Sequence, residues 1–232
     1  MPCTRKEFSD QNTLTAALAE KIGALLSAGI AKNGRASLVV SGGSTPVALF
    51  ERLSGLDIAW QDVGVTLVDE RWLAPSEVDS NEYLVRQHLL KDKAASAIFI
   101  GMKNSAGTAE AGETECAQQL ALVPRPFDVL VLGMGGDGHT ASLFPGADKL
   151  QAATDLSQDK LCMAITPPVA PYERMTLTLP AILNARRIFV HITGEKKKEA
   201  LEKALADGPS EVMPIRFILR QKNVPVTVFW AP

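Results

Sequence analysis

A turn rich in glycine and hydroxyl side chains follows the first strongly apolar run of the sequence. Residues 41–46 read SGGSTP and come directly after the apolar run 36–40 (ASLVV). Glycines let a ligand approach the main chain, and a helix that begins here would offer unpaired N–H groups and the positive end of its dipole. An ordinary tight turn whose hydroxyl caps the helix is the alternative. The pattern predicts an anion site formed by Gly42, Gly43, Ser44 and Thr45.

A second glycine-rich segment carries two titratable side chains. It reads GMGGDGHT at 133–140 and follows the apolar run 127–132 (FDVLVL). It matches the G-x-G-x-x-G pattern of dinucleotide sites, but that pattern should open a full helix, and Pro145 interrupts the chain soon afterwards. Asp137 and His139 on a turn at a strand end instead favour acid–base chemistry. The alternative for the histidine is a structural hydrogen bond in a polar loop.

Three charged residues end the next apolar run. Asp69, Glu70 and Arg71 follow residues 63–68, which we predict to be a strand. In open α/β sheets ligands bind at the carboxyl ends of the strands, so charges at this position are well placed to meet a ligand. A surface ion pair at a strand end is an equally simple interpretation.

Basic residues follow late in the chain. Arg174 comes after the proline-rich stretch 166–171, and Lys196, Lys197 and Lys198 begin a helical pattern after a glycine. Positive charge in the first turn of a helix is unfavourable with the helix dipole. We therefore expect one of the three lysines to serve an anion and the other two to be solvated.

The other histidines are weaker candidates, and several catalytic motifs are missing from the sequence. His88 lies in an amphipathic pattern, whereas His191 ends an apolar run and would come near the site if that run is a strand. The sequence contains no G-x-S-x-G, no G-x-x-x-x-G-K-[ST], no H-E-x-x-H and no Cys/His set with metal-ligand spacing. Any hydrolysis is therefore expected to use a positioned water and a general base, without a metal, a cofactor or a covalent intermediate.

Alternating apolar runs and helical patterns must position these residues. Near-continuous apolar strands that alternate with helices indicate an α/β fold, a mostly parallel Rossmann-like sheet with helices on both faces. We find no repeat and no long linker, and predict one domain over residues 1–232. Helices are expected at 10–31, 45–53, 81–90, 108–122 and 195–206, and strands at 36–40, 63–68, 97–100, 127–132, 161–165, 175–179, 187–192 and 226–230.

Composition narrows the function classes. Hydrophobic residues make up 46% of the 232 residues, and the formal net charge is −2, so no global field attracts nucleic acid or an anionic membrane. We expect no signal peptide and no apolar run as long as a transmembrane helix. Three cysteines without paired spacing indicate reduced thiols and a cytoplasmic protein, and we expect a monomer.

Six segments, in this order, resemble the 6-phosphogluconolactonases over residues 10 to 232. They read SGGSTP, VDERW, SNEYL, LGMGGDGHTASLFPG, APYERMTLT and TGEKKKEAL. The fourth is long and specific, whereas the first also occurs in similar form in the related glucosamine-6-phosphate deaminases. The resemblance implies a NagB/RpiA-like fold, no cofactor, and hydrolysis of 6-phospho-D-glucono-1,5-lactone in the oxidative pentose phosphate pathway.

The resemblance also implies roles for individual residues. The phosphate would bind at the turn of Gly42 to Thr45, assisted by Arg174 and by Lys197, which has the G-x-x-K spacing of the family. His139 would act as the general base with Asp137 behind it. Arg71 or loop N–H groups would stabilise the oxyanion, and Asp69 would lie near the sugar hydroxyls.

Two other functions remain open at this point. One is a sugar-phosphate deaminase or isomerase of the related family, in which a catalytic glutamate occurs five residues after the D-G-H histidine. Phe144 stands at that position here and cannot transfer protons. The other is a non-catalytic sugar-phosphate-binding module, although no DNA-binding or partner domain accompanies the α/β pattern.

Overall fold

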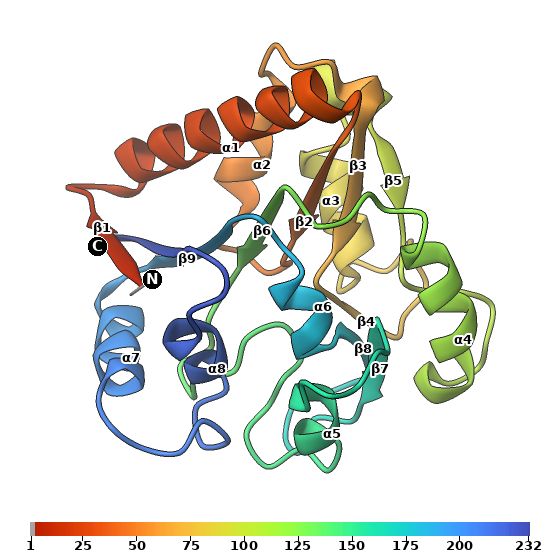
Figure 1. Cartoon of the computed structure of the whole chain (residues 1–232), viewed down its shortest axis with the longest axis vertical. Coiled ribbons are helices and arrows are strands. Elements are labelled where there is room, and N and C mark those ends of the chain that lie inside the picture. The colour runs from red at the N-terminus through yellow and green to blue at the C-terminus, as the bar shows by residue number, and fades with distance from the viewer. Residues whose placement is uncertain (1–2) are drawn as a thin grey trace.

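A seven-stranded parallel sheet forms the centre of the protein in the computed structural model, which describes residues 3–232 (Figure 1). Every neighbouring pair of strands in this sheet is parallel, as the apolar runs predicted. The first and last strands of the chain pair at one edge. The order is β1 (Thr4–Glu7), β10 (Val226–Ala231), β9 (Ile188–Thr193), β6 (Val129–Leu132), β2 (Ala36–Val40), β3 (Val63–Leu67) and β5 (Ile98–Ile100).

The order of the strands creates a switch point between β2 and β6. From β2 the chain moves outward through β3 to β5, and then returns to place β6 on the other side of β2. The segments that follow β2 and β6 therefore leave the sheet in opposite directions. In open α/β sheets such a divergence leaves a crevice at the carboxyl ends of the strands.

Both faces of the sheet are covered. All five residues of β2 and all four of β6 are buried, although their side chains alternate between the two faces. This explains why these strands have near-continuous apolar sequences. The helices are α1 (Gln11–Asn33), α2 (Val47–Ser54), α3 (Asn81–His88), α4 (Ala109–Leu120), α5 (Leu150–Thr154), α6 (Leu179–Leu183), α7 (Glu195–Leu205) and α8 (Ile215–Arg220), with 3₁₀ turns at Trp60–Asp62 and Asp92–Ser96.

Helix α1 shows how local sequence sets an element. The Asp10 carboxylate caps its first turn by accepting from the Thr13 N–H, and Gly34 ends it in the left-handed conformation. Leu14, Leu18, Ile22 and Leu26 form one fully buried stripe. Each such side chain contributes about 1.5–3 kcal/mol to folding. Contrary to the sequence expectation, α1 is long and apolar enough to span a membrane by composition, yet this apolar stripe packs into the core.

A second, antiparallel sheet corrects part of the prediction. It contains β4 (Asp69–Arg71), β8 (Arg174–Leu177) and β7 (Cys162–Ile165) in the order β4-β8-β7. Asp69 to Arg71 therefore form a strand of their own and do not end the preceding one, and the runs 161–165 and 175–179 do not join the main sheet. Short buried runs have the same apolar pattern in either kind of sheet, so periodicity could not separate them.

Other differences concern short elements. Strand β1 is polar and lies at the sheet edge, which removes the apolar pattern that marked the other strands. Helices α5, α6 and α8 have five or six residues, too few for a helical period. The segment predicted as a strand at 175–179 ends at Leu177, after which Thr178 caps α6.

The cysteines are free thiols. Cys116 of α4 and Cys162 of β7 are buried neighbours, although 46 positions separate them in sequence. A hydrogen bond to Cys162 and burial both raise the pKa of the Cys116 thiol. The Cys116 thiol is therefore protonated, and both side chains lie in the core.

Arg216 of α8 holds the segment that leads to α8. Its guanidinium is buried and donates to main-chain carbonyl oxygens of Lys203, Ala204, Ala206 and Pro209, at and beyond the end of α7. Ile215, the residue before Arg216, bonds the 133–140 loop: its N–H donates to the Gly138 carbonyl at 2.8 Å.

We predict that Arg216→Met lowers the free energy of unfolding by about 2–4 kcal/mol, because several buried carbonyls lose a charged donor. Urea denaturation measures the change. Arg220→Met is the matched control: this exposed arginine also binds two carbonyls, of Gly208 and Ala206, and its loss should cost less than about 1 kcal/mol. Equal losses in the two variants would contradict the role given to Arg216.

Candidate functional site

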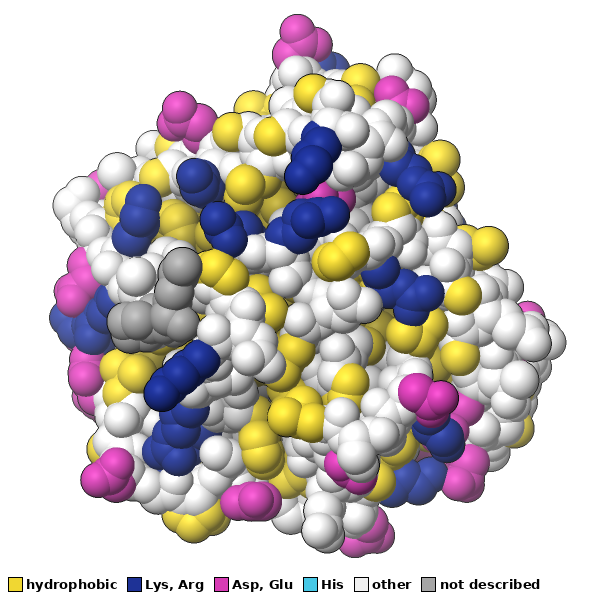
Figure 2. Space-filling model, in the orientation of Figure 1, with side chains coloured by type: hydrophobic (Ala, Val, Ile, Leu, Met, Phe, Trp, Pro, Cys, Tyr) yellow, Lys and Arg dark blue, Asp and Glu magenta, His cyan; other side chains and the backbone are white. Residues whose placement is uncertain are grey.

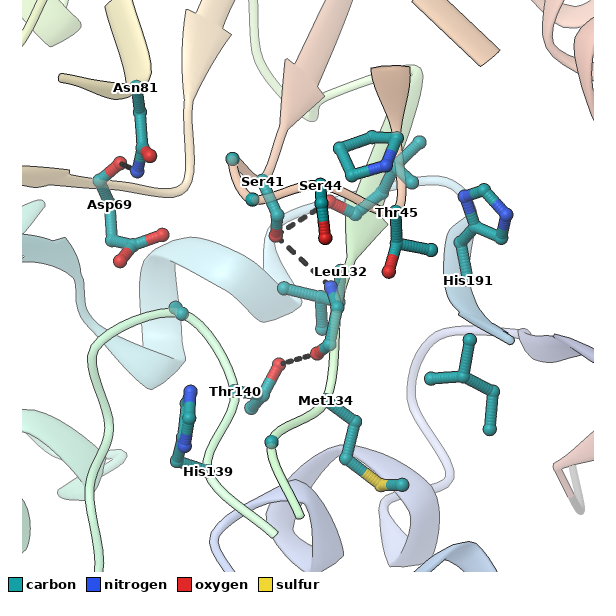
Figure 3. Close-up of a pocket in the computed structure, with 18 of the residues that line it drawn as sticks. Ser41, Ser44, Thr45, Asp69, Asn81, Leu132, Met134, His139, Thr140 and His191 are labelled. Atoms are coloured by element: carbon teal, nitrogen blue, oxygen red, sulfur yellow. Dashed lines mark hydrogen bonds between the residues drawn. The ribbon is translucent and has the colours of Figure 1, made fainter. Parts of the chain in front are cut away.

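A cavity of about 390 Å³ lies at the carboxyl ends of β2 and β6, at the switch point of the sheet (Figure 3). Residues of both sheets, of the loops that follow β2 and β6, and of α3 and α7 line it. Its lining includes Ser41, Gly42, Gly43, Ser44, Thr45, Asp69, Arg71, Asn81, Met134, His139, Phe144, Arg174, His191 and Lys197.

Ser41 joins the two loops that leave the switch point. Its hydroxyl donates to the Val131 carbonyl of β6 at 3.1 Å and accepts from the Gly133 N–H at 3.1 Å. The Ser41 N–H also donates to the Val131 carbonyl. The beginning of each loop is therefore fixed relative to the other, which sets the spacing across the cavity.

The 41–46 turn presents donors to the cavity. Gly43 has φ +92°, a conformation that side chains disfavour, and a Cβ on Gly42 would lie 1.9 Å from Asn81 Oδ1. Pro46 precedes α2 without a side-chain cap, so the first N–H groups of the helix lack that partner. The hydroxyls of Ser44 and Thr45 point toward the middle of the cavity (Figure 3). The turn therefore offers the donors that an anion site needs.

Two cations reach the same cavity. The Arg174 side chain is buried, donates to the Pro171 carbonyl at 3.0 Å, and has its Nε unpartnered among the described residues. Lys197 of α7 donates to the Met134 carbonyl at 2.6 Å. Burial lowers the pKa of both side chains, while Asp69 opposes the effect on the arginine and Asp137 that on the lysine. An anion between them would offset the burial of both charges.

His139 and Asp137 form a hydrogen-bonded pair. His139 Nδ1 lies 2.6 Å from Asp137 Oδ1, and the His139 N–H donates to the same oxygen at 3.1 Å. Burial acts to raise the pKa of Asp137, but the two bonds and the charge of the imidazole lower it overall. A carboxylate at Nδ1 holds the proton there, which leaves Nε2 of the neutral ring as an acceptor. The ring also packs on Phe144, with centroids 4.5 Å apart.

The loop that carries this pair closes on itself. The Gly135 N–H donates to the His139 carbonyl at 2.8 Å, and the Thr140 hydroxyl donates to the Gly133 carbonyl at 2.8 Å. Gly138 has φ +82°, and a Cβ there would lie 2.7 Å from Met213 Cβ. No helix begins at this turn, because the next helix in the chain is α5 at Leu150–Thr154, so the dinucleotide interpretation does not apply to it.

Asp69 and Arg71 face the cavity, whereas Glu70 faces the other way, as expected for alternate residues of a strand. The Asp69 carboxylate accepts from the Ser142 hydroxyl at 2.6 Å, and Arg71 donates to the Asp79 carbonyl at 2.5 Å. Both of these charged side chains line the cavity, and each has a hydrogen-bond partner that fixes its orientation.

Glu70 serves α3 and not the cavity. Its carboxylate is fully buried and accepts from the N–H groups of Arg71, Asn81 and Glu82 and from the Ser80 hydroxyl. Burial raises its pKa to about 7, although these four bonds oppose the rise. It therefore anchors the first turn of α3 and positions Asn81.

The structure brings together nearly all the residues predicted for the site. The same cavity is lined by Gly42, Gly43, Ser44, Thr45, Asp69, Arg71, His139, Arg174 and Lys197. Asp137 does not line it and bonds His139 from behind, at Nδ1 of the ring and at the main-chain N–H. Among residues 3–232, no three His, Cys, Asp or Glu side chains gather into a set able to hold a metal ion.

Two further residues line the cavity: Asn81, for which no role was predicted, and His191, which was only a weak candidate. Asn81 donates to the Asp69 carbonyl at 2.8 Å and fills the space left by Gly42. The SNEYL segment pointed to Asn81 only as part of a resemblance. For His191 the signal was weak: a polar residue that ends an otherwise apolar strand.

Comparison with known proteins places the chain among sugar-phosphate enzymes. The family model of the glucosamine-6-phosphate isomerases/6-phosphogluconolactonase matches residues 9–230. A 6-phosphogluconolactonase of Rhizobium meliloti is 44% identical over 97% of both chains. The crystal structure of a 6-phosphogluconolactonase from Shewanella baltica, 47% identical, covers 99% of this chain and 98% of its own with a TM-score of 0.97. A monomeric glucosamine-6-phosphate deaminase of the NagB superfamily, 20% identical over 98% of this chain and 97% of its own, shares the fold with a TM-score of 0.80.

Burial of the His191 imidazole makes the free energy of unfolding of the protein depend on pH. Only 4% of its surface is exposed, and burial lowers its pKa from 6.5 to about 4. Between these two values the unfolded chain binds a proton that the folded protein does not. Stability is therefore lost as the pH falls through this range.

We predict that the wild-type protein loses about 2 kcal/mol more than His191→Phe when the pH falls from about 7 to about 4.5. Urea denaturation of both proteins at the two pH values measures the difference. Other groups, including Glu70, titrate in both proteins and cancel in the comparison. Parallel pH dependences would show that the imidazole is not held neutral.

Proposed function

The chain belongs to the glucosamine-6-phosphate isomerase/6-phosphogluconolactonase family, and we propose that it is a 6-phosphogluconolactonase in which His139 activates the attacking water. The reaction is the hydrolysis of 6-phospho-D-glucono-1,5-lactone to 6-phosphogluconate in the oxidative pentose phosphate pathway. The observation that carries the mechanism is that the 41–46 turn, named the anion turn from here on, and the His139 imidazole line one cavity. Its volume of about 390 Å³ suits a small ligand.

One residue beyond the 133–140 turn separates hydrolysis from deamination. Phe144 stands where the deaminases of the family carry a glutamate, and its ring packs against His139. An apolar ring cannot relay a proton to a sugar amine or ring oxygen. It does shield one face of the imidazole from water, which suits a single base acting on one water molecule.

Binding begins with the phosphate. The turn from Gly42 to Thr45 supplies N–H and hydroxyl donors, and Arg174 and Lys197 supply positive charge. The Arg174 Nε that lacks a partner and the remaining hydrogens of the lysine ammonium are suited to phosphate oxygens. Anchoring the phosphate places the lactone carbonyl near His139, so that binding energy becomes orientation.

Hydrolysis then needs one base and one acid in turn. Neutral His139 takes a proton from water as the water oxygen attacks C1 of the lactone. The oxyanion that forms is stabilised by Arg71 or by loop N–H groups. When the intermediate collapses, the bond from C1 to the ring oxygen breaks, and protonated His139 returns its proton to that oxygen. Asp137 stabilises the imidazolium between these steps, and Asp69 accepts from a sugar hydroxyl.

We predict that His139→Asn lowers kcat by about 10²–10⁴-fold, because such a base typically contributes that much. The assay follows 6-phosphogluconate formed from freshly prepared lactone, with spontaneous opening subtracted. His88→Asn is the matched control, since this histidine lies in α3 and contacts Glu51 away from the cavity. A kcat of His139→Asn within threefold of the wild type would remove it as the base.

We further expect a cytoplasmic monomer without nucleic-acid or membrane partners. Figure 2 shows Lys and Arg side chains spread over one face of the molecule, several of them in a row across its upper part, with acidic side chains mostly toward the rim, and the formal net charge is −2. The exposed large apolar side chains come from separate segments: Val78, Ile98, Leu122, Leu156, Val169, Tyr172, Leu205 and Val212. Single exposed apolar side chains are common on monomers and do not by themselves mark an interface. Light scattering should therefore report one chain per particle, and a dimer mass would contradict the proposal.

A further inference from the structure

His191 is a buried polar side chain that the hydrolytic mechanism does not use. It lies near the end of β9, lines the cavity, and is 96% removed from solvent. Its Nδ1 is buried and has no hydrogen-bond partner among the described residues. An unpartnered buried nitrogen costs about 1–3 kcal/mol, so its retention in the wall of a ligand cavity points to a hydrogen bond that forms only when a ligand is bound.

The neighbour of this ring is the anion turn. Thr45 and His191 line both the substrate cavity and a second hollow beside α1 and α2, so the two side chains share the wall between them. Figure 3 shows the imidazole beside Thr45, whose hydroxyl points toward the middle of the cavity. No hydrogen bond joins the two side chains in the structure as it stands.

The chemistry of the two groups is complementary. At neutral pH the buried ring is uncharged and has one N–H to donate. A threonine hydroxyl has one hydrogen and two lone pairs, so a donor on one side leaves its hydrogen free for an acceptor on the other. A hydroxyl held in this way is a committed donor to an anion, and chains of such bonds strengthen one another.

We propose that His191 is a positioning residue of the phosphate site: its Nδ1–H donates to the Thr45 hydroxyl when the turn closes on the phosphate, and the hydroxyl hydrogen is thereby directed at a phosphate oxygen. The proposal rests on a phosphorylated substrate, as the proposed function requires. It gives the buried nitrogen a partner only in the complex, and it makes the ring responsible for affinity toward the phosphate and not for proton transfer.

Three variants test the proposal. His191→Phe keeps a buried ring without nitrogen, His191→Asn places an amide N–H near the position of Nδ1, and Thr45→Val removes the hydroxyl. Calorimetry measures binding of 6-phosphogluconate and of inorganic phosphate. Steady-state kinetics compares 6-phosphogluconolactone with unphosphorylated glucono-1,5-lactone. Thermal unfolding confirms that each variant is folded.

The expected result is a loss confined to phosphorylated ligands. His191→Phe should weaken 6-phosphogluconate and phosphate binding and raise KM for the phosphorylated lactone about five- to thirtyfold, the effect of one hydrogen bond, with kcat within threefold of the wild type. His191→Asn should restore most of the affinity. Thr45→Val should show a similar loss, and the double variant should lose little more than either single variant.

Three results would overturn the proposal. These are wild-type phosphate affinity in His191→Phe, an equal loss toward the unphosphorylated lactone, or additive losses in the double variant. Failure of the proposed function is a separate outcome: the wild-type protein would then hydrolyse neither lactone, while calorimetry with phosphate would still decide the role of His191.

Discussion

The adjacency of β2 and β6 is the constraint on which the rest of the structure depends. Their carboxyl ends lie side by side because the chain reverses its direction of travel across the sheet between them. Ser41, the residue after β2, bonds Val131 of β6 and Gly133 just beyond it, and so fixes the two loops against each other. With that spacing set, an anion turn and an imidazole face one volume although almost 100 residues separate them in sequence.

The sequence predicted the parts of this arrangement that follow from periodicity and backbone chemistry. Strands buried on both faces have continuous apolar runs, so β2 and β6 were located to within two residues. Apolar residues at helical spacing predicted a helix at 10–31, close to the observed bounds of α1, Gln11–Asn33. Because parallel strands end at one edge, the motifs after β2 and β6 were expected to meet, and they do.

What the sequence could not predict depends on direction and on contacts distant in the chain. Residues 69–71 have no pattern that reveals an antiparallel partner, so the side of the strand on which Glu70 lies could not be known. The fitting of Asn81 into the space above Gly42 depends on two loops that meet only in the folded protein. His191 looked like a strand terminus, because burial of a single polar side chain has no periodic pattern.

The bond from Lys197 to the Met134 carbonyl has a consequence for selectivity. One ammonium group borders the anion turn and also supports the main chain of the loop that presents the imidazole. A ligand in the 41–46 turn would therefore either compete with this bond or strengthen it, and the bond supports the loop that carries His139, the proposed base. Sugars without a phosphate would then be turned over more slowly as well as bound more weakly, because the bond from Lys197 to the loop differs when the 41–46 turn is empty.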